Sequence, residues 1–149
     1  MKSSVLIADS DIRVCRVLSR MINRLNFECF SVHDPHEFKS LCFEIEPDIV
    51  ILSVEMAFTE QDSLLEYLAD NYPHATVILL SNIDEDELYC SKMIDQASRL
   101  NMGGFLHKPI EIDSVKSILE GFTKKKRNTV KKSPPPGDAY NEHYCCTYT

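Results

Sequence analysis

The sequence predicts an α/β protein with a three-layer, doubly wound fold around a five-stranded parallel sheet. Short apolar runs alternate along the chain with segments whose apolar residues recur three and four positions apart, the spacing of an amphipathic helix. The runs are apolar throughout, as in strands of a parallel sheet that helices cover on both faces. Strict alternation of the two patterns indicates consecutive βα units joined by right-handed crossovers.

Five strand and helix pairs follow one another. The expected strands are VLIA (5–8), CFSV (29–32), IVIL (49–52), TVILL (76–80) and GFL (104–106). Helical patterns follow them over residues 14–25, 38–45, 64–72, 89–100 and 112–119. The residues expected at helix ends agree with this division. They are Asp11 before the first helix, Pro35 early in the second, Asp62 or Ser63 before the third, Asn82 or Asp84 before the fourth, and Gly103 and Gly104 after the fourth.

Length and composition indicate an ordinary globular protein. The 149 residues are enough for one domain with a substantial core, and 44% of them are apolar and 26% charged. No apolar run approaches the roughly 20 residues of a membrane span, and two aspartates interrupt the apolar stretch near the N-terminus. We therefore expect a cytoplasmic protein, with Cys15, Cys29, Cys42 and Cys90 as reduced and mostly buried thiols.

Charge divides the chain into two parts. Residues 1–122 hold 10 Lys/Arg against 21 Asp/Glu, whereas residues 123–149 hold 6 against 2 and include three consecutive prolines. We interpret 1–122 as the domain and 123–149 as a basic, flexible tail or linker without apolar periodicity. The acidic domain argues against direct nucleic-acid binding. In the tail, His143, Cys145 and Cys146 are too few for an ordered metal site, and CTYT fits a prenylation box only formally.

Polar residues end the predicted strands. Asp9 and Ser10 follow the first strand, Ser53 ends the third, Ser81 the fourth, and Lys108 follows the fifth. In doubly wound sheets the ligand crevice lies beyond the carboxyl ends of the strands. An acid, two hydroxyls and an ammonium group are therefore expected to converge at one edge, where we predict a pair between Asp9 and Lys108.

Four stretches, VLIADSD, PDIVILSVEM, VILLSN and GFLHKPI, together resemble the receiver domain of two-component response regulators over about residues 4–121. The resemblance implies the flavodoxin-like strand order 2-1-3-4-5 and a phosphorelay role. It also implies a bacterial protein. A receiver takes a phosphoryl group onto an aspartate, with Mg²⁺ held by two acids after the first strand and by a backbone carbonyl.

The resemblance assigns a role to each strand-end residue. Ser53 stands at the phosphoacceptor aspartate, and Ser10 stands at the second acid beside Asp9. The carbonyl that would hold the metal is that of Glu55. Ser81 matches the switch hydroxyl, Phe105 the switch aromatic, and Lys108 the lysine that contacts phosphate.

These substitutions predict a degenerate phosphoacceptor pocket. Asp9 alone faces Lys108, so the pair is neutral without a metal, and a serine hydroxyl cannot form an acyl phosphate. We expect a pseudo-receiver that is not an enzyme, has no catalytic residue and no cofactor, and signals by protein contact. Glu55 is expected to face solvent, and Mg²⁺ would have only Asp9 and Glu55 as ligands.

Two alternatives remain open. The first is a functional receiver phosphorylated at Asp9 or Glu55 with Mg²⁺. The second is a flavodoxin-like binder of a small ligand, which the absence of glycine in ADSDIR disfavours.

For partners, we expect a protein or a fused output domain, with contacts through about residues 84–121 and a homodimer as a further alternative. Residues 97–110 resemble receivers that precede EAL-type phosphodiesterase domains, which suggests cyclic-di-GMP signalling.

Overall fold

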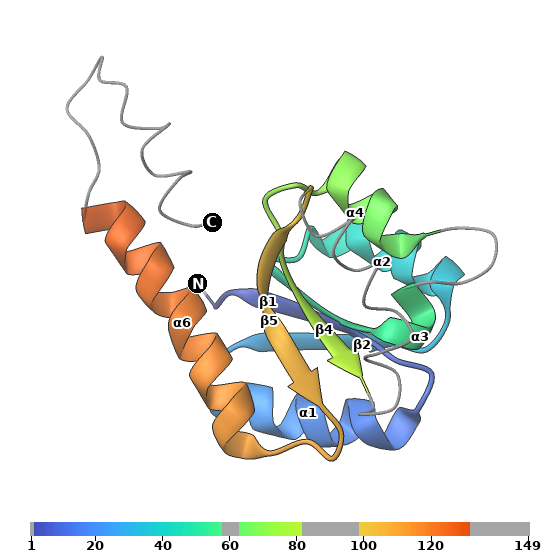
Figure 1. The fold of residues 1–149 in the computed structure, drawn as a ribbon, viewed down its shortest axis with the longest axis horizontal. Helices are drawn as coiled ribbons and strands as arrows, with labels where there is room; N and C mark the ends of the chain where they lie inside the picture. The colour runs from blue at the N-terminus through green and yellow to red at the C-terminus, as the bar shows by residue number, and fades with distance from the viewer. Residues whose placement is uncertain (1, 58–62, 82–98, 132–149) are drawn as a thin grey trace.

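The computed structural model of the protein describes residues 2–57, 63–81 and 99–131 (Figure 1). Its elements are β1 (Ser4–Ala8), α1 (Ile12–Arg24), β2 (Glu28–Val32), α2 (Pro35–Ile45), β3 (Ile49–Ser53), α3 (Val54–Ala57), α4 (Leu64–Asn71), β4 (Thr76–Ser81), β5 (Asn101–His107) and α6 (Ile112–Lys131). One five-stranded sheet has the order β2-β1-β3-β4-β5, and all neighbouring strands are parallel. The predicted fold class and strand order are confirmed.

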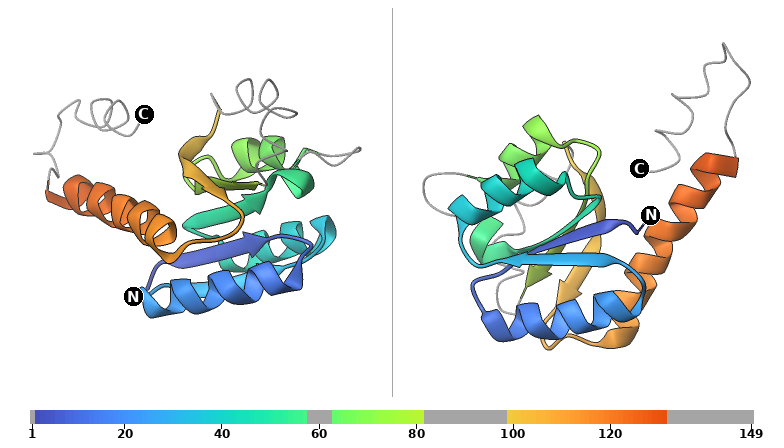
Figure 2. Two further views of the ribbon diagram at one scale, coloured as in Figure 1. Left: turned by 60° about the horizontal axis from the view of Figure 1, so that its bottom comes forward. Right: turned by 180° about the vertical axis from the view of Figure 1, so that it is seen from behind.

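Helices lie on both faces of the sheet. Figures 1 and 2 show α1 and α6 on one side and α2, α3 and α4 on the other. Successive strand residues point to opposite faces, so each central strand contributes to two cores. Leu6 and Val50 belong to the core beneath α2 and α4, whereas Val5 and Ile49 belong to the core beneath α1 and α6. All five residues of β3 are buried, which explains why its sequence is apolar without alternation.

Each core is closed by the apolar stripes of its helices. Against α1 and α6 the buried side chains are Cys15, Leu18, Ile22, Val115 and Leu119. Against α2 and α4 they are Phe38, Cys42, Leu64, Leu65 and Leu68. These residues recur at the three- and four-residue spacing that predicted the helices.

Side-chain caps begin three of the helices. Asp11 accepts a hydrogen bond from Arg13 N at 2.9 Å, and Ser63 accepts one from Glu66 N at 3.3 Å. Pro35 is the first residue of α2, which Asp34 caps. The predictions for Asp11, Pro35 and Ser63 are confirmed. Asn82 and Asp84 lie outside the described residues, as does the predicted fourth helix up to residue 98.

Gly103 and Gly104 do not end a helix, so this prediction is wrong. Both lie inside β5, which begins at Asn101. The register between β4 and β5 shifts at Val77/Ile78, and Gly104 has a φ of 147°, which favours glycine. A Cβ at Gly103 would lie 2.4 Å from Thr76 Cγ2. The glycines serve close strand packing at an irregular point of the sheet.

Helix α6 continues beyond the predicted end of the domain. It runs to Lys131, and Thr123 Oγ1 donates a hydrogen bond to Leu119 O at 3.1 Å. The absence of regular structure predicted from residue 123 onward is therefore wrong for residues 123–131. Lys and Arg are good helix formers, so a helix can continue there without an apolar stripe. The functional division into 1–122 and 123–149 stays a prediction.

The described cysteines are free thiols. Cys15 and Cys42 are buried and Cys29 is half-buried, while Cys90 lies outside the described residues. Burial raises the pKa of the Cys15 thiol to about 11 and that of the Cys42 thiol to about 12. Both are therefore protonated at neutral pH, as expected for structural cysteines. None of the described helices is long and apolar enough to cross a membrane.

Candidate functional site at the carboxyl edge of the sheet

The buried polar side chains gather at one edge of the sheet. Among the described residues, Asp9, Ser53 and Ser81 are the only buried polar ones, with whole-residue exposures of 1%, 3% and 2%. They stand at the carboxyl ends of β1, β3 and β4, which are three consecutive strands of the sheet. All three residues thus lie at the edge of the sheet where their positions at strand ends predicted them.

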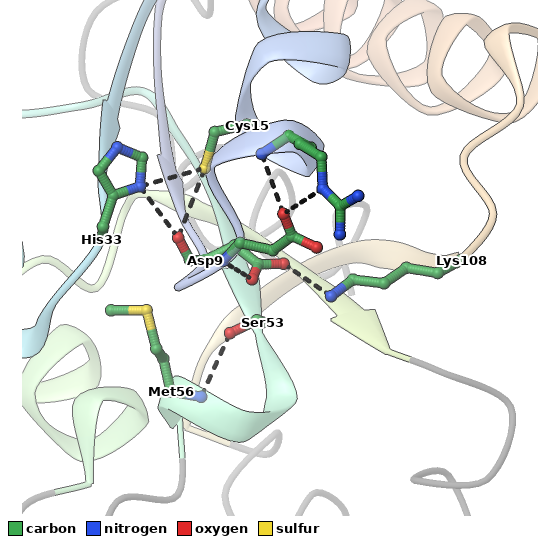
Figure 3. A network of polar contacts seen from close by, with 8 residues as sticks. Asp9, Cys15, His33, Ser53, Met56 and Lys108 are labelled. Atoms are coloured by element: carbon green, nitrogen blue, oxygen red, sulfur yellow. Dashed lines mark hydrogen bonds and ion pairs between the residues drawn. The ribbon is translucent and has the colours of Figure 1, made fainter.

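Asp9 and Lys108 form the predicted pair. Lys108 Nζ lies 2.9 Å from Asp9 Oδ2, and the side chains are 22% and 2% exposed (Figure 3). Oδ2 has no aligned hydrogen-bond donor in the described part of the chain, so the contact is an ion pair at close range. Asp9 Oδ1 accepts a hydrogen bond from Asp11 N at 2.9 Å. Both oxygens of the buried carboxylate therefore face a donor or a cation.

Ser53 is bonded to backbone. Its Oγ accepts a hydrogen bond from Met56 N at 3.2 Å, across the start of the short helix α3. Figure 3 shows the hydroxyl directed toward Met56 N, while the carboxylate of Asp9 points to Lys108. Ser53 thus performs the structural task of a short polar residue at a strand-to-helix turn.

Ser81 lies beside β5, the strand that carries Phe105. Ser81 Oγ is 3.4 Å from His107 Nδ1, and Ser81 O accepts a hydrogen bond from Lys108 N at 2.9 Å. Through these contacts, the backbone at Lys108 is hydrogen-bonded to the end of β4. The Phe105 side chain is 51% exposed, and it lines a surface hollow of about 270 Å³ together with residues 106–109. The Lys108–Pro109 peptide bond is cis.

The donor set does not fit Mg²⁺. Glu55 and Ser10 are exposed, as expected for Glu55, and the described ranges hold no group of three or more His, Cys, Asp or Glu side chains that could bind a metal ion. Asp9 already has Lys108 at Oδ2 and the Asp11 amide at Oδ1. Mg²⁺ requires several oxygen ligands in near-octahedral geometry and is usually held through carboxylates. A single carboxylate that is already neutralised by an ammonium ion does not provide this.

A second group of contacts at Asp9 was missed by the sequence analysis. His33 Nδ1 lies 3.2 Å from the backbone carbonyl oxygen of Asp9, and Cys15 Sγ lies 3.5 Å from it. The same sulfur is 3.7 Å from His33 Nδ1 (Figure 3). His33 directly follows β2, so the rule that selected the other strand ends would also have selected it. Asp9 therefore contacts Lys108 through its side chain and contacts Cys15 and His33 through its backbone carbonyl oxygen.

Comparisons with known proteins agree with this fold. Residues 5–120 match the family model of the response regulator receiver domain. No curated protein matches the sequence. Many solved structures do.

Three of these structures illustrate the similarity. The signal receiver domain of an HD domain-containing protein from Pseudomonas fluorescens Pf-5 has a TM-score of 0.72 and 21% identity, covering 88% of this chain and 93% of its own. The REC domain of AraT, a response regulator from Geobacillus stearothermophilus, has a TM-score of 0.73 and 21% identity, covering 86% and 98%. The N-terminal domain of an uncharacterized Wolinella succinogenes protein has a TM-score of 0.72 and 25% identity, covering 85% and 98%.

Proposed function

Because this chain belongs to the response regulator receiver domain family of two-component signalling, we propose that it is a pseudo-receiver. It acts through protein contacts and does not undergo phosphorylation. The observation that carries the proposal is the closed Asp9–Lys108 pair beside a strand-end serine that is bonded to backbone. Its degenerate phosphoacceptor pocket consists of Asp9, Ser10, Ser53, Glu55, Ser81 and Lys108.

The charge balance of the pocket supports this proposal. A site with three acids and one lysine has excess negative charge that a divalent cation can neutralise, whereas one acid and one lysine already sum to zero. Lys108 approaches Asp9 to 2.9 Å, so an incoming phosphoryl group would have to displace an existing buried ion pair. A serine hydroxyl at position 53 forms only a phosphate ester, and the hydrogen bond described for it comes from Met56 N and does not involve a side-chain base.

The alternative acceptors are poorly placed. Glu55 is exposed on α3, away from the buried edge, and Asp9 is held by Lys108 and by the Asp11 amide. A functional receiver that uses Asp9 or Glu55 with Mg²⁺ would need to break these contacts and assemble metal ligands. For this reason the pseudo-receiver is the favoured function.

A contact surface on β5 and α6 supports signalling through a partner. Phe105 and Ile112 are 51% and 42% exposed, and they rank among the few large apolar side chains exposed in the described ranges. Contiguous exposed apolar patches mark interaction sites, and we propose that these two residues belong to such a patch. Part of the predicted surface, residues 84–98, lies outside the described residues. We propose a protein partner or a fused output domain, with cyclic-di-GMP signalling and a homodimer as specific versions.

The experiment restores the missing acids. Wild type, Ser53→Asp, and the double variant Ser10→Asp/Ser53→Asp are titrated with Mg²⁺ by calorimetry and then incubated with a small phosphodonor. We expect Mg²⁺ binding and slow phosphate incorporation only in the double variant, because only it combines a second acid next to Asp9, at position 10, with a carboxylate at position 53. The matched control is Ser10→Asn/Ser53→Asn, which has similar side-chain size without charge. Wild type that binds Mg²⁺ as tightly as the double variant would contradict the proposal.

A further inference from the structure

A surface hollow of about 420 Å³ lies between α1 and the edge strand β2, on the other side of Asp9 from Lys108. Figure 2 shows α1 running alongside the sheet next to β2. Arg16, Ser19 and Arg20 line it from α1, and Ser31 and His33 line it from β2 and the residue that follows. Ile12, which is 49% exposed, also lines it.

The charge of this hollow contrasts with the acidic chain. The protein has a net charge of −7, yet α1 carries four arginines and no acidic residue. Arg13 pairs with Asp11 at 3.6 Å. Arg16 and Arg20 make no ion pair within the described ranges, although they are one helical turn apart and face the same hollow. Like charges at this spacing repel each other, and an anion between them would relieve the repulsion.

The donors suit a phosphate group. Two guanidinium groups supply planar, paired N–H donors, and two serine hydroxyls add further donors. His33 Nδ1 faces the Asp9 carbonyl at 3.2 Å, and no described residue hydrogen-bonds its Nε2. A carboxylate offers two oxygens, whereas a terminal phosphate offers three and carries more charge, so phosphate matches this donor set better.

The size indicates more than an inorganic ion. A hollow of about 420 Å³ falls in the range of small-molecule sites and is too large for phosphate alone. Ile12 and Cys15 add apolar surface to the lining. We propose that this hollow binds a small molecule with a terminal phosphate group, held by Arg16 and Arg20, with its organic part against Ile12.

The hollow is linked to the strand-end pocket through one backbone group. His33 Nδ1 and Cys15 Sγ, which both line the hollow, lie 3.2 Å and 3.5 Å from the carbonyl oxygen of Asp9. The side chain of this residue is paired with Lys108 (Figure 3). An occupant that reorients His33 therefore changes the environment of the Asp9 peptide. The proposal does not depend on the pseudo-receiver function.

The test is a titration of the full chain at fixed ionic strength, in which binding is detected by changes in the amide NMR shifts. The probes are adenosine monophosphate, inorganic phosphate and adenosine. We expect saturable shifts at Asp9, Ser19 and His33 with adenosine monophosphate, weaker saturation with inorganic phosphate, and none with adenosine. Equal affinity for the two phosphate probes would contradict the contact of an organic part with Ile12.

Matched variants separate the site from general charge. Arg16→Gln/Arg20→Gln removes the two guanidinium groups in the hollow, and Arg13→Gln/Arg24→Gln removes the same charge from the same helix outside it. We expect the first variant to lose about tenfold or more in affinity and the second to change by less than about threefold. Thermal unfolding confirms that both remain folded. The proposal is overturned by equal losses in the two variants, by binding of adenosine alone, or by no saturation with either phosphate probe.

Discussion

Removing one member of the Asp9–Lys108 pair should destabilise the fold by an amount that depends on which member is removed. Asp9 is 2% exposed, and Lys108 is 22% exposed. Lys108→Met keeps an unbranched apolar side chain but leaves a carboxylate buried without a cation. Asp9→Asn keeps an acceptor for the Asp11 amide and leaves an ammonium group that already reaches water. We therefore expect Lys108→Met to cost more than Asp9→Asn.

The expected loss in the free energy of unfolding depends on how deeply the two charged groups are buried. Breaking a fully buried ion pair typically costs about 3–5 kcal/mol. Partial exposure of Lys108 and the remaining hydrogen bond from Asp11 N to Asp9 Oδ1, 2.9 Å long, both reduce that figure. We expect about 2–4 kcal/mol for Lys108→Met and about 1–2 kcal/mol for Asp9→Asn. The double variant should lose less than the sum, because it leaves no uncompensated charge.

The assay is urea unfolding of wild type, both single variants and the double variant, with free energies extrapolated to water. Thermal unfolding provides a second measure, at about 3 °C per kcal/mol for a protein of this size. A coupling free energy of about 1–3 kcal/mol is expected for side chains in contact. Losses that add within about 0.5 kcal/mol would show that the two side chains do not interact. A larger loss from Asp9→Asn than from Lys108→Met would refute the argument from burial.

Three further predictions concern the rest of the fold. Gly103→Ala should cost about 1–3 kcal/mol in urea unfolding, since its Cβ would lie 2.4 Å from a side-chain carbon of β4. Gly121→Ala, with nothing within 4 Å, is the matched control and should be neutral or stabilising. Alkylation of native protein at pH 8, mapped by mass spectrometry, should leave Cys15 and Cys42 unmodified, because burial raises the pKa of both thiols; reaction as fast as in urea would contradict their burial. The amides of α2 lower the pKa of Asp34, so its stabilising effect should be present at pH 7 and lost as pH falls below the ordinary value of 3.8. Asp34→Ala should therefore lower Tm more at pH 7 than at pH 3, and an equal loss at both would argue against a contribution of the Asp34 charge to this cap.

Much of the fold followed from local sequence signals. The central strands β1, β3 and β4 are buried on both faces, so their apolar runs are unmistakable. Asp11, Pro35 and Ser63 begin helices through contacts with residues two or three positions away. Such short-range chemistry is readable from sequence because it does not depend on the rest of the chain.

Features set by contacts between distant segments were not predictable in the same way. Gly103 and Gly104 fit a helix end by residue type, although Gly104 also begins the expected strand GFL; β5 starts earlier, at Asn101, and contains both glycines. Glycine serves both purposes, and only the packing against Thr76 and Ile118 decides between them. The end of α6 was likewise missed, because the sequence after Phe122 has no apolar stripe although Lys and Arg sustain a helix.

The candidate site shows the same division. The Asp9–Lys108 pair followed from the rule that strand carboxyl ends meet at one edge. The contact of Cys15 and His33 with the Asp9 carbonyl oxygen did not, because a backbone acceptor leaves no trace in the identity of its residue. His33 still carried a usable signal, namely its position directly after β2.

The most direct measurement of the central claim is the intact mass of wild type after incubation with a small phosphodonor and Mg²⁺. A receiver domain with its acceptor aspartate, treated alongside, shows that the donor is active. The account predicts no gain of a phosphoryl group, because Ser53 cannot form an acyl phosphate and Asp9 is held by Lys108 at 2.9 Å. A gain of one phosphoryl group on wild type, mapped to a carboxylate of Asp9 or Glu55, would contradict it.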